Sequence, residues 1–258
     1  MDYEAITVEA RDDVVTITLN RPDKMNALST QMRAEITHAV KAAPDMGRVV
    51  VLTGAGRAFC SGQDLSDRAS GAAFDLEAPL RDEYVPMLRA IIDCPVPTIS
   101  AVNGPAAGAG ANLALVADVV IASDEAYFVQ AFARIGLIPD AGGTWFLPRQ
   151  MGLARAMGAS LFTDKIDARQ AADWGMIYEV AAAADFAGHV RNRALQLATG
   201  PTATYAHIKT ALRASFDNSL DDQLALEAKL QGQCGRTRDF REGVVAFLEK
   251  RPARFEGR

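Results

Sequence analysis

Residues 95–123 read PVPTISAVNGPAAGAGANLALVADVVIAS and contain two short apolar segments, PTISAV at 97–102 and DVVIA at 118–122. A loop rich in glycine and alanine and the small-residue segment ANLALVA lie between them. Short, wholly apolar strands are typical of parallel sheets that are buried on both faces. We therefore predict an α/β fold in which buried strands lead into glycine-rich loops.

The same pattern occurs earlier in the chain. VVVLT at 49–53 is followed by the loop GAGRAFCSGQDL, and three such units predict repeated ββα elements whose loops gather at one end. Before them, residues 6–20 alternate between apolar and polar around an Asp-Asp turn, which predicts a β-hairpin. Ser29 is a suitable N-cap for an amphipathic helix from Thr30 to Ala43. The chain is therefore expected to open with strands and a βα step.

The character of the chain changes after Pro148, where helical patterns dominate. We predict helices over Ala154–Thr163, Ala168–Trp174, Ala184–Ala198, Thr202–Phe216 and Leu220–Gly232. Because no linker rich in Pro, Gly or Ser separates the strand-rich front from the helical back, we expect one folded unit.

The composition argues against several classes of function. With 27 basic and 32 acidic residues, a net charge of −5 and no run of Lys or Arg, the chain is a poor candidate for binding nucleic acid. The acidic N-terminal sequence and the lack of a long apolar stretch predict a cytoplasmic protein with no membrane partner. The three cysteines lack CxxC spacing, so we expect reduced thiols and no metal cluster. The glycines after residue 103 lack GxGxxG spacing, which disfavours a nicotinamide site.

Three loops carry candidate chemistry. The small residues of AFCSGQDL at 58–65 and NGPAAGAGAN at 103–112 would let backbone N–H groups approach a ligand and form an oxyanion hole. For each loop taken alone, however, close helix packing or a simple turn is the favoured explanation. In GLIPDAGGT at 136–144, apolar surroundings would desolvate Asp140 and raise its pKa towards the range of a general acid/base. A turn-forming aspartate is the alternative.

Together the loops resemble the crotonase (enoyl-CoA hydratase/isomerase) superfamily over essentially the whole chain. The matching segments are NRPDKMNALS at 20–29, GRAFCSGQDL at 56–65, residues 95–123, and AFARIGLIPDAGGTWFLPRQMG at 131–152. The resemblance implies a spiral core of ββα units over 1–195 with an acyl-CoA site, and a helical C-terminal region over 196–258 that forms a homotrimer or a dimer of trimers. Coenzyme A would enter as part of the substrate, with no other cofactor.

The resemblance also implies roles for particular residues. The backbone N–H groups of Gln63 and Ala109 would form the oxyanion hole, and the two glutamates of the family's hydratases correspond here to Asn112 and Phe132. Without those carboxylates, and with Asp140 at a position where hydratases carry glycine, double-bond isomerisation is favoured over hydration. The substrate-binding set implied by the resemblance is Lys24, Ala27, Ser61, Asp64, Leu65, Phe132, Pro139 and Lys250, the last from a neighbouring subunit.

Within the isomerases, the chain looks closest to the ring-1,2-epoxyphenylacetyl-CoA isomerases of bacterial phenylacetate degradation. The segments that carry this likeness include GQDLSDR at 62–68, GLIPDAGGTWFLPR at 136–149 and REGVVAFLEKR at 241–251. The alternatives are a linear-chain Δ3,Δ2-enoyl-CoA or dienoyl-CoA isomerase, a hydratase, an aromatic acyl-CoA dehalogenase and an RNA-binding relative. The dehalogenase is disfavoured because its tryptophan corresponds to Phe132. The segment Ser66–Pro86 would shape the acyl pocket, and its conformation does not follow from the sequence.

Overall fold

The main sheet of the protein, seen in a computed structural model that describes residues 3–68 and 75–258, has six strands in the order β1-β2-β3-β4-β6-β9. β1 and β2 are antiparallel, and every later neighbour in this sheet is parallel. The strands are β1 (Ile6–Arg11), β2 (Val14–Leu19), β3 (Val49–Gly54), β4 (Thr98–Val102), β6 (Val119–Ser123) and β9 (Glu179–Ala181).

The predicted hairpin and first helix are both confirmed. Asp12 and Asp13 join β1 to β2 with φ values of 55° and 59°, a left-handed turn that matches the twist of a two-residue hairpin. Helix α1 (Thr30–Ala42) begins after Ser29, whose Oγ accepts a hydrogen bond from the Met32 N–H at 3.2 Å.

The loops that follow β3 and β4 lie side by side because these strands are parallel neighbours. Cys60 pairs with Ala106 in a short parallel bridge, and the Ala107 N–H donates to the Cys60 carbonyl at 2.9 Å. A second sheet continues from there, with β5 (Ala106–Ala107) parallel to β7 (Tyr127–Val129) and β8 (Ile166–Asp167) antiparallel to β7. Helix α4 (Ala109–Leu115) follows β5 directly, so both glycine-rich loops reach its first turn.

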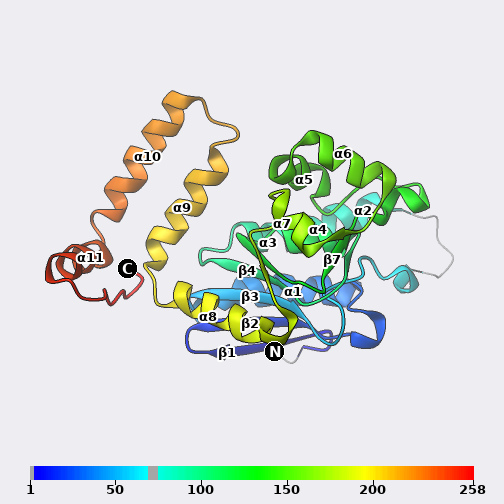
Figure 1. The fold of residues 1–258 in the computed structure, drawn as a ribbon, viewed down its shortest axis with the longest axis horizontal. Coiled ribbons are helices and arrows are strands. Elements are labelled where there is room, and N and C mark those ends of the chain that lie inside the picture. Colours follow the sequence, from blue (N-terminus) through cyan, green and yellow to red (C-terminus); the bar gives the residue numbers. More distant parts are fainter. Residues whose placement is uncertain (1–2, 69–74) are drawn as a thin grey trace.

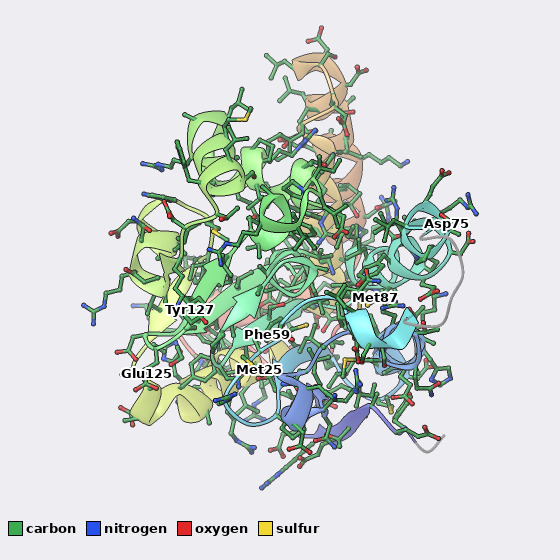
Figure 2. All side chains as sticks on the ribbon, turned by 90° about the vertical axis from the view of Figure 1, so that its right-hand side faces the viewer. Met25, Phe59, Asp75, Met87, Glu125 and Tyr127 are labelled. Atoms are coloured by element: carbon green, nitrogen blue, oxygen red, sulfur yellow. The ribbon has the colours of Figure 1, made fainter. Side chains whose placement is uncertain are left out.

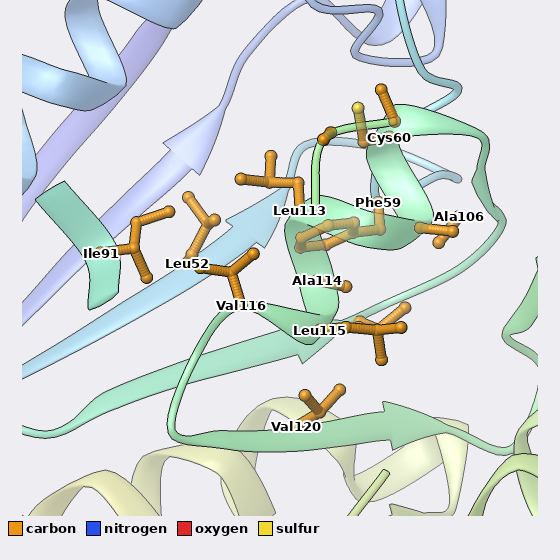
Figure 3. Packing of buried hydrophobic residues seen from close by; sticks show 14 of the residues in the cluster. Leu52, Phe59, Cys60, Ile91, Ala106, Leu113, Ala114, Leu115, Val116 and Val120 are labelled. Atoms are coloured by element: carbon orange, nitrogen blue, oxygen red, sulfur yellow. The ribbon is translucent and has the colours of Figure 1, made fainter. Parts of the chain in front are cut away.

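Helices cover both faces of the main sheet (Figure 1). On one face α8 (Phe186–Ala198) packs Val190 and Ala194 against Val49 and Ile99 of the strands. The larger core lies on the other face, beneath α1, α3 (Val85–Ile92) and α4. Figure 3 shows Phe59 and Cys60 in the same packed cluster as the α4 residues.

A continuous helical segment runs from α2 (Glu77–Pro79) through a π-helical turn (Leu80–Tyr84) into α3. Pro86 lacks the N–H that would bond back towards residue 82, and proline in a helix disturbs the regular hydrogen-bond ladder at this point. The part of this segment up to Pro86 belongs to the predicted pocket segment Ser66–Pro86, of which residues 69–74 lie outside the described residues. In the view of Figure 2, Met87 of α3 lies between Asp75 and the core residue Phe59.

The remaining helices form two groups. α5 (Gly143–Met151), α6 (Leu153–Phe162) and α7 (Ala168–Asp173) lie above the second sheet, whereas α9 (Thr202–Ala214), α10 (Leu220–Cys234) and α11 (Arg238–Glu249) project away from the core (Figure 1). The predicted boundary between 195 and 196 falls inside α8. None of the helices in the described ranges is long and apolar enough to cross a membrane.

A half-buried ion cluster attaches α9 to the core. Lys209 and Arg213 of α9 both pair with Asp118, at 2.7 and 2.8 Å, and Asp118 also accepts hydrogen bonds from Thr98 at the start of β4. The Lys209 ammonium further donates to the carbonyls of Cys94 and Val96. Since each charge has several partners, the cluster fixes where the C-terminal helices leave the core.

Candidate active site

Two backbone N–H groups lie together where the glycine-rich loops meet. A Cβ on Gly62 would lie 2.8 Å from the Ala107 carbonyl oxygen and 3.5 Å from the Ala109 nitrogen, so only glycine allows this approach. Gln63 follows Gly62, and Ala109 is the first residue of α4. Neither N–H donates to a backbone carbonyl within the described ranges. The structure thus brings the two predicted oxyanion-hole residues together with free N–H groups.

Gly108 sets the direction of the Ala109 N–H. Its backbone has φ 52° and ψ −128°, a conformation essentially confined to glycine, and the peptide plane that carries the Ala109 N–H turns with this ψ. Phe132 is the nearest side chain, 3.8 Å from where a Cβ on Gly108 would lie. Phe132 is itself buried, so it presents an apolar ring beside the N–H pair.

Asp140 lies in the loop before α5 as an enclosed carboxylate. Its side-chain atom Oδ1 is buried and has no hydrogen-bond partner among the described residues. Burial raises the pKa of Asp140 to about 6, and a backbone hydrogen bond opposes that shift only partly. A carboxyl group with this pKa can both accept and return a proton near neutral pH.

A buried amide network holds the Asp140 loop against α4. The Asn112 side-chain nitrogen donates to the Asp140 carbonyl at 2.7 Å, and the Asn112 oxygen accepts from Gln130 at 2.8 Å. A Cβ on Gly143 would lie 2.3 Å from the Asn112 amide nitrogen, so glycine is required there. Since Asn112 is one turn after Ala109, this network fixes the Asp140 loop relative to the N–H groups of Gln63 and Ala109.

We expect Asn112→Ala to weaken both folding and catalysis. The change leaves the Asp140 carbonyl and the Gln130 amide without their buried partner, which should lower the free energy of unfolding by about 2 kcal/mol. The loosened loop should lower kcat while the pH midpoint of activity stays near that of the wild type. Urea denaturation and a pH–rate profile measure the two effects, with Gly188→Ala, an exposed change in α8, as control. An unchanged unfolding energy would show that the network is not holding the loop.

The predicted substrate-binding residues near the N-terminus form one group. The Ser61 hydroxyl and N–H donate to the carbonyls of Lys24 and Met25, and Leu28 pairs with Gln63. Lys24 and Leu65 are exposed, and Ala27 is buried. This group therefore lies on the Gln63 side of the two free N–H groups.

Asp64, by contrast, already has protein partners. Its carboxylate pairs with Arg21 at 2.7 Å and accepts from the Ser66 hydroxyl at 2.6 Å. Those hydrogen bonds lower the pKa of Asp64, the Ser66 hydroxyl contributing most. Asp64 is therefore ionised at neutral pH, and its bonds to Arg21 and Ser66 hold the loop after Gln63.

The other predicted residues lie elsewhere. Pro139 precedes Asp140 in its loop, whereas Lys250 ends α11, at the opposite end of the molecule from α4 (Figure 1). A cavity of about 860 Å³ between α3, α5 and α9 reaches Gly142 but includes none of Asp140, Gln63 and Ala109. Among the described residues, no group of three or more His, Cys, Asp or Glu side chains could hold a metal ion.

Sequence reasoning missed two buried residues beside the site and the structural role of a third. The two residues are Gln130, which belongs to the amide network, and Tyr84, which comes from the π-helical turn, and the third is Asn112. A lone polar residue in the apolar helix AGANLAL was a usable signal for Asn112, because buried amides need partners. No comparable signal marks Tyr84.

Comparison with known proteins finds relatives that match this chain over its full length. The profile of the enoyl-CoA hydratase/isomerase family matches residues 9–258. A Rhodobacter capsulatus protein named "probable enoyl-CoA hydratase" is 57% identical and covers 100% of both chains. The 1,2-epoxyphenylacetyl-CoA isomerase of Escherichia coli is 46% identical and covers 99% of both chains. The solved structure of an enoyl-CoA hydratase from Bacillus anthracis matches with a TM-score of 0.91 at 30% identity, covering 99% of this chain and 100% of that chain.

Proposed function

Because the chain belongs to the enoyl-CoA hydratase/isomerase family, we propose that it is an acyl-CoA isomerase that uses Asp140 as its single acid/base. The observation that carries the proposal is the enclosed Asp140 carboxylate, fixed through Asn112 to the helix that begins with Ala109. One carboxylate suits the transfer of a proton between two carbons, because the base that removes the proton becomes the acid that returns it.

In the proposed reaction, Asp140 removes a proton from the carbon next to the thioester carbonyl. The electron pair of the broken C–H bond moves into the carbonyl, and the N–H groups of Gln63 and Ala109 stabilise the enolate oxygen. Charge spreads along the conjugated system, and Asp140 returns the same proton at a more distant carbon. Because no electrons or groups leave the substrate, the reaction requires neither a metal nor a redox cofactor.

For the substrate, we favour the ring epoxide of phenylacetyl-CoA, converted to the oxepin-CoA of phenylacetate catabolism. In this case the proton shift is accompanied by cleavage of the C–C bond between the two epoxide carbons, whose electrons join the double bonds of the seven-membered ring. The 46% identity to the Escherichia coli isomerase supports this assignment. A linear-chain Δ3,Δ2-enoyl-CoA or dienoyl-CoA isomerase is the second candidate, because the same N–H pair and carboxylate would serve it.

Hydration is the reaction named for the 57% identical relative, and the site of this chain argues against it. Adding water requires one group to activate water and another to protonate carbon. The two positions that correspond to the hydratase glutamates hold Asn112 and Phe132. The Asn112 side chain is hydrogen-bonded to Asp140 and Gln130, and Phe132 is an apolar ring.

The direct test offers the protein 3,4-dehydroadipyl-CoA and crotonyl-CoA in parallel, with the absorbance of the conjugated thioester as readout. Isomerisation of the first compound without loss of crotonyl-CoA supports the isomerase. Hydration of crotonyl-CoA at a comparable rate contradicts it.

The activity should depend on pH through Asp140. Its pKa is raised to about 6, and only the ionised form removes a proton, so kcat/KM should be flat above pH 7 and fall tenfold per unit below about pH 6. A pH–rate profile of the wild type between pH 4.5 and 9 measures the midpoint. A midpoint near 4, typical of an exposed carboxyl group, would contradict the desolvated state of Asp140.

We also propose that α9, α10 and α11 mediate association into a trimer or a dimer of trimers. These helices and the turn between α9 and α10 expose many large apolar side chains, which an interface would bury: Ile208, Leu212, Phe216, Leu220, Leu224, Phe240, Val244, Val245, Phe247 and Leu248. Association would also let Lys250 reach the coenzyme A of a neighbouring site. Light scattering during size exclusion measures the mass, and a monomer at micromolar concentration contradicts the proposal.

A further inference from the structure

Tyr84 is a buried polar residue that the proposed mechanism does not use. It is 1% exposed and closes the π-helical turn Leu80–Tyr84, and its O–H proton has no acceptor among the described residues. Buried polar groups are nearly always paired, so a buried O–H proton without an acceptor requires an explanation. Single π-helical turns within α-helices are often found at functional sites.

Tyr84 lies on the helix that packs against the Asp140 loop. It belongs to the same buried cluster as Ala109, Phe132 and Ala141. One turn further on, the Leu88 side chain lies 3.9 Å from where a Cβ on Gly142 would be. Burial raises the pKa of Tyr84, and the nearby Asp140 carboxylate adds to that shift while Arg33 opposes it. Tyr84 is therefore a neutral donor on the helix that packs against the Asp140 loop.

Arg33 holds the Tyr84 ring in place. Its guanidinium lies 4.8 Å from the ring centroid, and it is anchored by the Leu28 carbonyl and the Glu83 carboxylate at 2.6 and 2.8 Å. The Arg33 side chain is only 1% exposed. Because a guanidinium has donors and no acceptor, it leaves the O–H proton of Tyr84 available for another partner.

In the proposed mechanism, each of the other polar groups of the site already interacts with a particular substrate atom. The N–H groups of Gln63 and Ala109 bind the thioester oxygen, and Asp140 accepts a C–H proton. If the Tyr84 hydroxyl also donates to the substrate, the acyl group must therefore carry a second acceptor atom. A plain hydrocarbon chain has none, whereas a ring epoxide or oxepin carries an oxygen close to the reacting carbons.

We propose that the Tyr84 hydroxyl donates a hydrogen bond to this second oxygen and so selects acyl-CoA thioesters whose acyl group carries an acceptor oxygen. The inference rests on the proposed isomerase function and adds a substrate class to it. Tyr84 keeps its proton throughout, so no bond to it forms or breaks. Sites built to hydrogen-bond a substrate atom discriminate strongly against analogues that lack it.

Two unreactive ligands of nearly equal size test the contact. We would measure the Kd of 2-methoxyphenylacetyl-CoA and 2-ethylphenylacetyl-CoA by titration calorimetry, because the two differ in one acceptor oxygen. Tyr84→Phe should shift the ratio of the two Kd values by about tenfold against the methoxy compound, the effect of one lost hydrogen bond. The matched control Tyr178→Phe, at an exposed residue, should leave the ratio unchanged.

The possible outcomes separate this inference from the proposed function. An unchanged ratio in Tyr84→Phe, or failure of both ligands to bind, overturns the inference. If the wild type isomerises 3,4-dehydroadipyl-CoA but Tyr84→Phe does not change the ratio of the two Kd values, the isomerase function is supported and the role of Tyr84 is contradicted. If the Kd ratio changes but no isomerisation occurs, the Tyr84 contact is supported and the isomerase function is contradicted.

Discussion

Asp140→Asn is expected to lower kcat for 3,4-dehydroadipyl-CoA by about 10⁴-fold. General acid/base groups contribute typically 10²–10⁴-fold, and the upper end applies here because Asp140 both removes and returns the proton. KM should change much less, because the N–H groups of Gln63 and Ala109 remain. Steady-state kinetics, with the conjugated thioester absorbance as readout, measures both constants.

The same variant should be more stable than the wild type at alkaline pH. Burial raises the folded-state pKa of Asp140 to about 6, above its value in the unfolded chain. The stability linked to its protonated form is therefore complete below about pH 4 and is lost as pH rises through 6. Removing the charge should raise the free energy of unfolding at pH 8 by ~1–3 kcal/mol, with little change at pH 4. Urea denaturation at both pH values checks this sign, and inactivity with a lowered stability would instead indicate misfolding.

The fold was largely predictable because its main strands and helices carry local signals. The apolar runs that became β3, β4 and β6, the Asp-Asp hairpin and the Ser29 cap all appear in a few neighbouring residues. The resemblance to the crotonase superfamily and the α/β fold class are confirmed by relatives that match the whole chain. Helix α5 was missed because Gly143 and Pro148 both argue locally against a helix, and packing overrides them.

The loops that form the site could be predicted from the sequence, whereas the residues that hold these loops in place could not. The glycine-rich loops and Asp140 can be found in the sequence itself, whereas Gln63 and Ala109 come from the resemblance to the family. The roles of all three residues remain predictions. The hydrogen bond from Asn112 to Asp140 joins residues 28 positions apart, and no local sequence pattern indicates it. Tyr84 is positioned by Arg33, 51 positions earlier in the chain, and by the π-helical turn that it closes. Such contacts depend on tertiary packing, which spacing along the chain does not encode.

Gly108→Ala is expected to lower kcat by about 10²–10³-fold, the usual cost of one lost oxyanion-hole donor. A Cβ at residue 108 would meet only Phe132 ring atoms at 3.8 and 3.9 Å, so space is not the obstacle. The obstacle is the backbone conformation at φ 52° and ψ −128°, because adopting it costs alanine about 1–3 kcal/mol. The chain should relax by rotating the peptide plane before Ala109, which turns its N–H away from the enolate oxygen.

The control for this prediction is Gly188→Ala, where no neighbouring atom lies within 4 Å of the added Cβ and φ is not positive. It should leave kcat unchanged, since alanine is favoured over glycine in a helix. Kinetics and thermal unfolding of both variants separate catalysis from folding. If Gly108→Ala lost a few degrees of Tm and retained its kcat, the Ala109 N–H would not be an oxyanion donor. The enolate would then depend on Gln63 alone, and the geometry of the two glycine-rich loops would need another explanation.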